Sequence, residues 1–195
     1  MKNNYLFENI EQYKKDLAKL ISFPTVLKDE YPNNEMKNAL SFMKEIAERD
    51  GMKVYINPDG YYGYIEIGQG QDMVGILTHI DVVPPGNVDQ WESNPFELRE
   101  EDGILYGRGT TDDKGPLMLS YYLLKYLKDL NLNKRIRLIF PTDEESSWRG
   151  VAKYKELEEV PTFGITPDSS FPVTFLEREA VQMELHSKVS DSLGW

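Results

Sequence analysis

Short apolar runs of strand length alternate along this chain with segments of helical period, and that alternation limits the folds open to it. Apolar residues recur every three or four positions over residues 6–21 and 35–49, which predicts two amphipathic helices. A strongly apolar helix is expected over residues 117–130 and a weaker one over residues 150–158. Strands are expected at residues 52–57, 61–67, 73–78, 135–140 and 163–166. Helices interleaved with apolar strands predict an α/β fold, a three-layer α/β/α sandwich around a mixed, mostly parallel sheet.

The length of 195 residues favours one domain with one sizeable core. A turn at residues 58–60 should join the first two strands. A hairpin is also expected where residues 96–99 and 104–106 flank Asp102 and Gly103.

The charge balance and the residue types exclude several classes of protein. Acidic residues outnumber basic ones by 33 to 22, and the net charge of −11 disfavours nucleic acid as a partner, because no basic cluster offsets it. No apolar stretch approaches the roughly 20 residues of a membrane-spanning helix. The N-terminal segment also lacks the apolar core of a signal peptide, so a cytoplasmic protein without membrane contact is expected. Because the chain has no cysteine, any metal must be held by His, Asp and Glu.

The scarce histidines give the first candidate site. His79 follows an apolar strand, and Asp81 lies two positions later. Alternate residues of an extended segment face the same way, so Asp81 can reach the His79 ring and fix its tautomer, as carboxylates do for metal-binding histidines. The alternative is a His–Asp pair that only closes a loop.

A pair of adjacent carboxylates gives the second candidate. Asp112 and Asp113 stand just before Lys114, between a predicted strand and the apolar helix. Adjacent carboxylates raise each other's pKa, and a nearby cation is the simplest reason for such a pair. The alternative is a helix N-terminus enriched in Asp, with Pro116 in its first turn. The segment matches neither a phosphate-binding nor a dinucleotide-binding glycine loop.

Two further acidic residues follow the strand that ends at Phe140. Glu144 and Glu145 lie at the strand end where open α/β sheets place their sites. Neighbours in an extended chain point to opposite sides, so one can bind a metal while the other faces an attacked carbonyl. The alternative is a solvated charge run before the next helix.

Asp168 follows the last predicted strand, and alone it is an Asp in a turn. Imidazole and carboxylates are ligands of hard or borderline cations, and two metals in one site need a shared carboxylate. Four strand ends together offer such ligands, namely His79, Asp112, Glu145 and Asp168.

The order and wording of these motifs resemble the M20 family of metallopeptidases, and within it the PepV-like dipeptidases of bacteria. The motifs occur up to about Val173 as THIDVVPPG, Trp91 with Pro95-Phe96, YGRGTTDDKGP, TDEES and TPDSSFP. The resemblance implies a zinc-peptidase-like catalytic domain that hydrolyses dipeptides, a small peptide substrate. It also implies two zinc ions in the site, with cobalt or manganese as substitutes.

The same resemblance assigns roles to the candidate residues. The metal ligands that it implies are His79 and Asp168 for one zinc, Glu145 for the second, and Asp112 shared between the two. Glu144 would be the general base, and Asp81 would orient His79. A cis peptide bond between Asp112 and Asp113 is implied as well.

The chain departs from the family in its length. Family members are longer and carry a lid or dimerisation domain after the Asp168 region, followed by a late His ligand to the second zinc. Residues 1–175 are therefore expected to be the N-terminal part of the catalytic domain, and residues 176–195 the start of a truncated lid. His186 lies in MELHSK, which does not match the late motif. One zinc is expected to bind well and the second weakly, and the chain alone should have little dipeptidase activity.

Two functions from different classes follow from these observations. The first is a zinc-dependent dipeptidase or a catalytic-domain fragment of one, and the second is a non-catalytic remnant that keeps the fold and partial metal binding. A two-metal phosphoesterase fits less well, because only Arg108, Lys114 and Arg149 stand near the acids to hold phosphate. The apolar run at residues 181–185 is expected to be an exposed strand through which the chain forms homo-oligomers.

Overall fold

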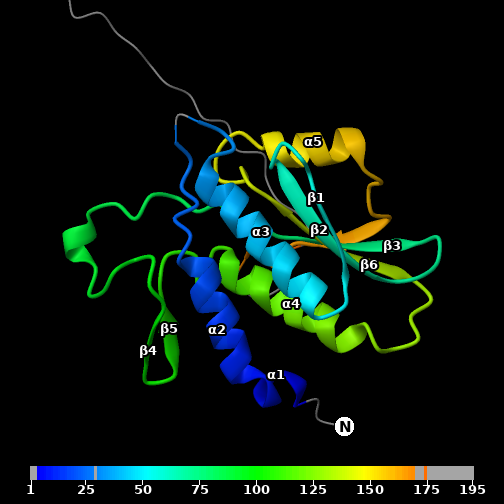
Figure 1. Ribbon diagram of the computed structural model, residues 1–195, viewed down its shortest axis with the longest axis horizontal. Helices are drawn as coiled ribbons and strands as arrows, with labels where there is room; N and C mark the ends of the chain where they lie inside the picture. The colour runs from blue at the N-terminus through cyan, green and yellow to red at the C-terminus, as the bar shows by residue number, and fades with distance from the viewer. Residues whose placement is uncertain (1–3, 29, 170–173, 175–195) are drawn as a thin grey trace, which may run out of the picture.

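The computed structural model of the protein describes residues 4–28, 30–169 and 174. Helices and strands pack in three layers, as the sequence predicts (Figure 1). The expected strand at residues 181–185, His186 and the expected second domain at residues 176–195 lie outside the described residues. No helix in the described part of the chain is long and apolar enough to cross a membrane.

In the described part of the chain, the central sheet has five strands in the order β1-β2-β6-β3-β7. Their bounds are β1 (Lys53–Ile56), β2 (Tyr62–Gly68), β3 (Met73–Leu77), β6 (Arg135–Pro141) and β7 (Phe163–Ile165). β2 pairs antiparallel with β1 and β6, whereas β3 pairs parallel with β6 and β7. The mixed sheet of the prediction is confirmed. Its parallel and antiparallel pairings are equal in number rather than mostly parallel, because the short connections after β1 and β2 each reverse the chain.

Helices cover both faces of the sheet (Figure 1). Their bounds are α1 (Tyr5–Glu8), α2 (Ile10–Ile21), α3 (Asn34–Arg49), α4 (Lys114–Leu127) and α5 (Arg149–Leu157). Side chains of β6 alternate between two cores: Leu138 and Phe140 face the larger core with α2, α3 and α4, and Ile139 packs with Tyr154 of α5. This period of two is what a strand buried on both faces requires.

Two helices differ from their predicted bounds by more than one residue. The helix expected over residues 6–21 is interrupted at Asn9, whose side-chain amide donates to the carbonyl of Tyr5 at 2.8 Å. α4 begins at Lys114 rather than at residue 117, because Pro116 fits the first turn of a helix, where its missing N–H has no partner to lose.

A separate hairpin, β4 (Arg99–Glu101) and β5 (Ile104–Tyr106), projects from the body beside α2 (Figure 1). It follows a loop that contains the short helix η1 (Val88–Gln90). The first strand starts at Arg99 rather than at residue 96, because Asn94 forms a turn in which its side chain accepts from the N–H of Phe96 at 3.0 Å.

The parallel pair β3 and β6 sets the position of the loops that follow it. Pairing continues past the strands, since the N–H of Thr78 donates to the carbonyl of Ile139 at 2.9 Å and that of Ile80 to Pro141 at 3.0 Å. β7 runs parallel to β3 on its other side. The chain therefore leaves all three strands at one edge of the sheet.

Polar contacts between α2, α3 and α4 fix these helices against one another. Asp16 of α2 accepts from the guanidinium of Arg49 at 3.1 Å and from the hydroxyl of Tyr122 at 2.9 Å. Asp50, at the end of α3, accepts from the hydroxyl of Tyr121 at 2.5 Å and from Arg49 at 3.1 Å. Asp16 thus joins α2 to both α3 and α4, and Asp50 joins α3 to α4. Both lie where a carboxylate without partners would destabilise the fold.

Replacing Asp50 with Asn should lower the free energy of unfolding by about 1–2 kcal/mol near neutral pH, a figure reduced for partial solvent screening. Burial raises the pKa of the Asp50 carboxyl, but hydrogen bonds from Arg49, Tyr121 and Lys125 outweigh it and lower the pKa from 3.8 to about 2. A carboxyl with a depressed pKa stabilises the folded protein at any pH above the ordinary pKa of 3.8. This stabilisation is lost as the pH falls from 3.8 through about 2. Urea denaturation of both proteins should therefore show a difference that shrinks over this acid range.

Asp129→Asn is the matched control, because this side chain is exposed and pairs only with Lys128, at 3.5 Å, among the described residues. It should change stability little at any pH. A difference between wild type and Asp50→Asn that stays constant through the acid range would contradict the proposed ion-pair contribution.

Candidate metal centre

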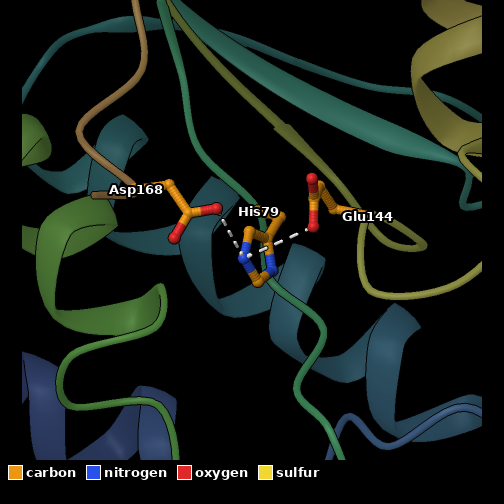
Figure 2. Close-up of side chains that lie close together, drawn as sticks. All are labelled: His79, Glu144 and Asp168. Atoms are coloured by element: carbon orange, nitrogen blue, oxygen red, sulfur yellow. Dashed lines mark ion pairs between the residues drawn. The ribbon is translucent and has the colours of Figure 1, made fainter. Parts of the chain in front are cut away.

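His79 lies at the centre of an acidic cluster, two residues beyond the end of β3, and its side chain is 1% exposed. Its Nε2 atom lies 2.9 Å from Oδ1 of Asp112, 3.4 Å from Oδ2 of Asp168 and 4.0 Å from Oε2 of Glu144. Figure 2 shows Asp168 and Glu144 pointing toward the His79 ring from opposite sides. The structure thus brings together predicted residues from the loops after β3, β6 and β7 and from the segment before α4.

The other ring nitrogen of His79 is held by the main chain. Nδ1 lies 3.0 Å from the carbonyl oxygen of Asp81, and 3.5 Å from its Oδ1 atom. A carbonyl oxygen only accepts, so Nδ1 carries the hydrogen of this bond. Nε2 of the neutral ring is then left as a ligand atom, which is the tautomer that metal-binding histidines use. The Asp81 carbonyl thus lies closer to Nδ1 than the Asp81 carboxylate does, and the role of that carboxylate in orienting His79 stays a prediction.

The Asp81 carboxylate instead holds the loop that follows β6. Its two oxygens accept from the N–H groups of Glu144 and Glu145, each at 3.1 Å. Asp81 is buried, so these charge-assisted bonds supply the partners that a buried carboxylate requires. The main chain of both glutamates is thus held close to the loop that carries His79.

The segment before α4 adds a second buried carboxylate. A cis peptide bond joins Asp112 and Asp113, as the resemblance implies. Asp113 is fully buried, and its Oδ2 atom accepts from the N–H of His79 at 2.9 Å. Asp112, in contrast, is half exposed and directs Oδ1 at the His79 ring. Asp113 therefore holds the main chain of His79, while Asp112 faces its ring.

Lys114 was not predicted as a site residue, although it supports this segment. Its side chain is fully buried, and Nζ donates to the carbonyl oxygens of Leu20 at 3.1 Å and Phe23 at 2.6 Å. These carbonyls lie at and just beyond the end of α2, where helical acceptors lack partners. A lysine at the first residue of a largely apolar helix is the sequence signal that points to such a role.

Burial, followed by the charges of neighbouring groups, shifts the pKa values of the clustered acidic residues. Burial is the largest cause of a raised pKa for three carboxyl groups, those of Glu144, Glu145 and Asp168. Burial also dominates for Asp113, whose pKa rises to about 8. Burial lowers the pKa of His79, but Asp81 and other carboxylates outweigh it and raise the value to about 10. A bound cation would remove the electrostatic cost that these shifts reflect.

The donor atoms fit a divalent metal. They form two groups, His79 with Glu144 and Asp168, and His79 with Asp112 and Glu145, and the atoms of each lie within 4.8 Å of one another. Ligands about 2.0–2.2 Å from a tetrahedral zinc stand roughly 3.3–3.6 Å apart, so small shifts would place either group around an ion. Oε1 of Glu145 is buried and has no hydrogen-bond partner among the described residues. The assignment of each ligand to an ion stays a prediction.

Comparison with known proteins places this site in a family. The model of the family described as Peptidase family M20/M25/M40 matches residues 75–187. All the predicted site residues, from His79 to Asp168, lie in that span.

Two bacterial relatives are similar over most of the chain. A Bacillus subtilis (strain 168) protein named "Putative dipeptidase YtjP" is 46% identical over 157 residues, which are 79% of this chain and 33% of that protein. A Staphylococcus aureus (strain USA300) protein, also named as a dipeptidase, is 40% identical over 190 residues, or 91% of this chain and 40% of that protein. The chain thus spans a third to two fifths of the length of these relatives.

Solved structures share the fold. Dug1p, a dipeptidase from Saccharomyces cerevisiae, matches with a TM-score of 0.68 at 23% identity, over 78% of this chain and 36% of that one. Human carnosine dipeptidase 1 matches with a TM-score of 0.64 at 22% identity, over 86% of this chain and 40% of that one. At these identities the match bears on the fold alone.

We predict that the chain binds one zinc ion tightly and that His79→Ala or Asp168→Ala abolishes this binding, because each removes a ligand atom of the central group. Isothermal titration calorimetry of the metal-free proteins measures the effect. Asp89→Ala, which removes an exposed carboxylate outside both donor groups, should bind zinc like wild type. Equal zinc uptake by wild type and both site variants would show that the ligands are assigned wrongly.

Proposed function

Because this chain belongs to the M20/M25/M40 family of peptidases, we propose that it supplies the metal-binding catalytic part of a dipeptidase. The observation that carries the proposal is the ring of carboxylates from three separate segments around Nε2 of His79. The names of the bacterial relatives support dipeptides as the substrate class.

We propose zinc as the metal, since a set of one imidazole and several carboxylates suits zinc, with cobalt and manganese as substitutes. The proposed ligands are His79 and Asp168 for the first ion, Glu145 for the second, and Asp112 shared by both. When bound, the metal polarises the carbonyl of the peptide bond and makes water a stronger nucleophile.

Glu144 is the proposed general base. Its Oε2 atom lies 4.0 Å from Nε2 of His79, and burial raises the pKa of its carboxyl. It takes a proton from the water that attacks the peptide carbonyl carbon, and gives it to the amine nitrogen as the C–N bond breaks. The bond from the Glu144 N–H to Asp81 keeps the base in place while it does so.

The proposed second ion has fewer ligands from this chain. Among the described residues, only Asp112 and Glu145 join His79 in the second donor group, and the proposed scheme gives His79 to the first ion. Catalytic zinc sites use three protein ligands, so we propose that the second ion binds this chain weakly. The 195-residue chain alone is then expected to hydrolyse dipeptides slowly, and its counterpart in a longer protein to hydrolyse them well.

Hydrolysis of phosphate esters is less well supported, because two of the three nearby basic side chains are already paired. Arg149 donates to Asp143 at 2.6 Å, and Nζ of the buried Lys114 donates to the carbonyl of Leu20. Arg108 lies over the ring of Trp91, and its Nε atom has no hydrogen-bond partner among the described residues, so one basic group is left to hold a phosphoryl group.

A fusion protein provides the activity test. In it, this chain replaces the matching part of the Bacillus subtilis relative, and hydrolysis of Leu-Gly and Ala-Ala is followed with added zinc, cobalt or manganese. We expect the fusion to be active and Glu144→Gln to lower its rate by about 10²–10⁴-fold, the usual cost of losing a general base. Zinc content should stay near that of the parent fusion.

Glu145→Gln is the matched neighbour substitution. It should lower the affinity for the second zinc, because it removes a ligand rather than the base. The reverse pattern would mean that the roles of the two glutamates are exchanged. A folded, zinc-loaded fusion without hydrolysis would instead favour the non-catalytic alternative.

A further inference from the structure

One buried acidic residue in the loop after β6 has no part in the proposed reaction. Asp143 stands directly before Glu144 and Glu145, and its side chain is fully buried. A buried carboxylate needs hydrogen-bond partners, and all those that Asp143 has among the described residues belong to residues 146–149. The loop that carries the two glutamates thus closes on the residue that begins it.

Four donors surround the Asp143 carboxylate. Its Oδ1 atom accepts from the hydroxyl of Ser146 and, at 3.3 Å, from the main-chain N–H of Ser147. Its Oδ2 atom accepts from Nε of Arg149 at 2.6 Å and from the main-chain N–H of Arg149 at 3.3 Å. The Asp143 carbonyl accepts from the N–H of Trp148 at 2.9 Å. One residue therefore holds the main chain at three successive positions beyond the glutamates.

The same carboxylate supplies the cap of α5. This helix begins at Arg149, and the side chain of Trp148 before it makes no capping bond. Asp143 accepts from the first N–H of the helix instead, where the helix dipole favours a negative charge. Trp148 has a φ angle of 58°, which a bulky residue seldom adopts. The turn that brings Arg149 back to Asp143 therefore depends on contacts outside Trp148 itself.

Arg149 ties the loop to a segment far away in the sequence. Its guanidinium lies 3.8 Å from the centre of the Tyr31 ring, a cation–π contact. The Tyr31 hydroxyl lies 3.0 Å from Oγ1 of Thr142. Because the hydrogen of the Thr142 hydroxyl goes to a main-chain carbonyl, Tyr31 is the donor. The contacts thus run from Thr142 through Tyr31 and Arg149 back to Asp143, which follows Thr142 in the chain.

We propose that Asp143 is a positioning residue for Glu144, with Arg149 as its counter-ion; this inference rests on the proposed function. The N–H of Glu144 donates to Asp81 at 3.1 Å, and Asp143 holds the chain that follows. A general base must lie within a hydrogen bond of the proton that it takes, and a displacement of about 1 Å can lower a rate on the order of 10²-fold. Asp143 lies outside both donor groups, so it acts on the reaction through Glu144.

The competing explanation is that Asp143 only stabilises the start of α5. A loss of stability would lower the amount of folded protein, and it would lower the rate to the same degree with or without the base. A positioning role, in contrast, affects the rate only when Glu144 is present to be positioned. A double-mutant cycle between residues 143 and 144 separates the two explanations.

The test uses the fusion protein described above, with saturating zinc and Leu-Gly as the substrate. Asp143→Asn keeps the size of the side chain and removes its charge. We expect kcat per folded, zinc-loaded protein to fall about 10- to 100-fold, while KM stays within about twofold. In a Glu144→Gln background the same substitution should lower the residual kcat by less than about twofold, because the base is already gone. Urea denaturation and zinc content give the folded, loaded fraction.

Should Asp143→Asn fail to fold, two neighbouring serines form a matched pair of variants. Both are exposed, but only the hydroxyl of Ser146 donates to Asp143, whereas Ser147 uses its main-chain N–H. Ser146→Ala should therefore lower kcat about 3- to 10-fold, the effect of losing one hydrogen bond. Ser147→Ala keeps the main-chain bond and should change kcat by less than about twofold.

The outcomes separate this inference from the function on which it rests. An unchanged kcat in Asp143→Asn, a loss of about tenfold or more that persists in the Glu144→Gln background, or equal effects of the two serine substitutions would overturn the positioning role. Each of these results would leave the proposed function standing. A parent fusion that loads zinc and hydrolyses no dipeptide would overturn the proposed function, and this inference with it.

Discussion

The carboxylate of Asp81 joins the loops that leave two neighbouring parallel strands, β3 and β6. It accepts from the main-chain N–H groups of Glu144 and Glu145, each at 3.1 Å, and the carbonyl of the same residue holds the ring of His79 at 3.0 Å. A buried carboxylate needs such partners, and both amides need an acceptor. One residue therefore contacts both the imidazole of His79 and the main chain of the two glutamates.

The cost of this arrangement is electrostatic. Carboxyl groups are gathered around one imidazole, and burial raises the pKa of Glu144, Glu145 and Asp168 above their ordinary values. The carboxyl groups stay close together despite their repulsion because other contacts fix the surrounding main chain. Asp113 holds the N–H of His79, and Lys114 holds the end of α2. A divalent cation at the centre would offset the repulsion, and the same charge would serve the chemistry.

The sequence predicts the layers and the meeting of the loops, because both follow from periodicity and from where strands end. Apolar residues with a period of two mark β6, and acidic residues after it and after β7 are placed at one edge of the sheet by parallel pairing alone. The joint occurrence of His79, Glu144 and Asp168 could thus be foreseen from single elements.

Other features depend on contacts between distant segments, which local patterns do not contain. The carbonyl of Asp81 contacts the His79 ring, and its carboxylate contacts the loop after β6. These two contacts can be predicted only when the position of that loop is known. The support that Lys114 gives to α2 joins residues more than ninety positions apart. The sheet has as many antiparallel as parallel pairings because β6 lies between β2 and β3. The order of the strands in the sheet cannot be predicted from the sequence of any one strand.

We propose that His79 and the carboxylates around it form a metal centre, which anomalous diffraction can locate. Crystals of the chain grown with zinc would be measured above and below the zinc absorption edge. We expect a strong anomalous peak within bonding distance of Nε2 of His79 and of an oxygen of Asp168 or Asp112, about 2.0–2.2 Å from each. A crystal with full zinc uptake whose anomalous peaks all lie away from the His79 ring would contradict it.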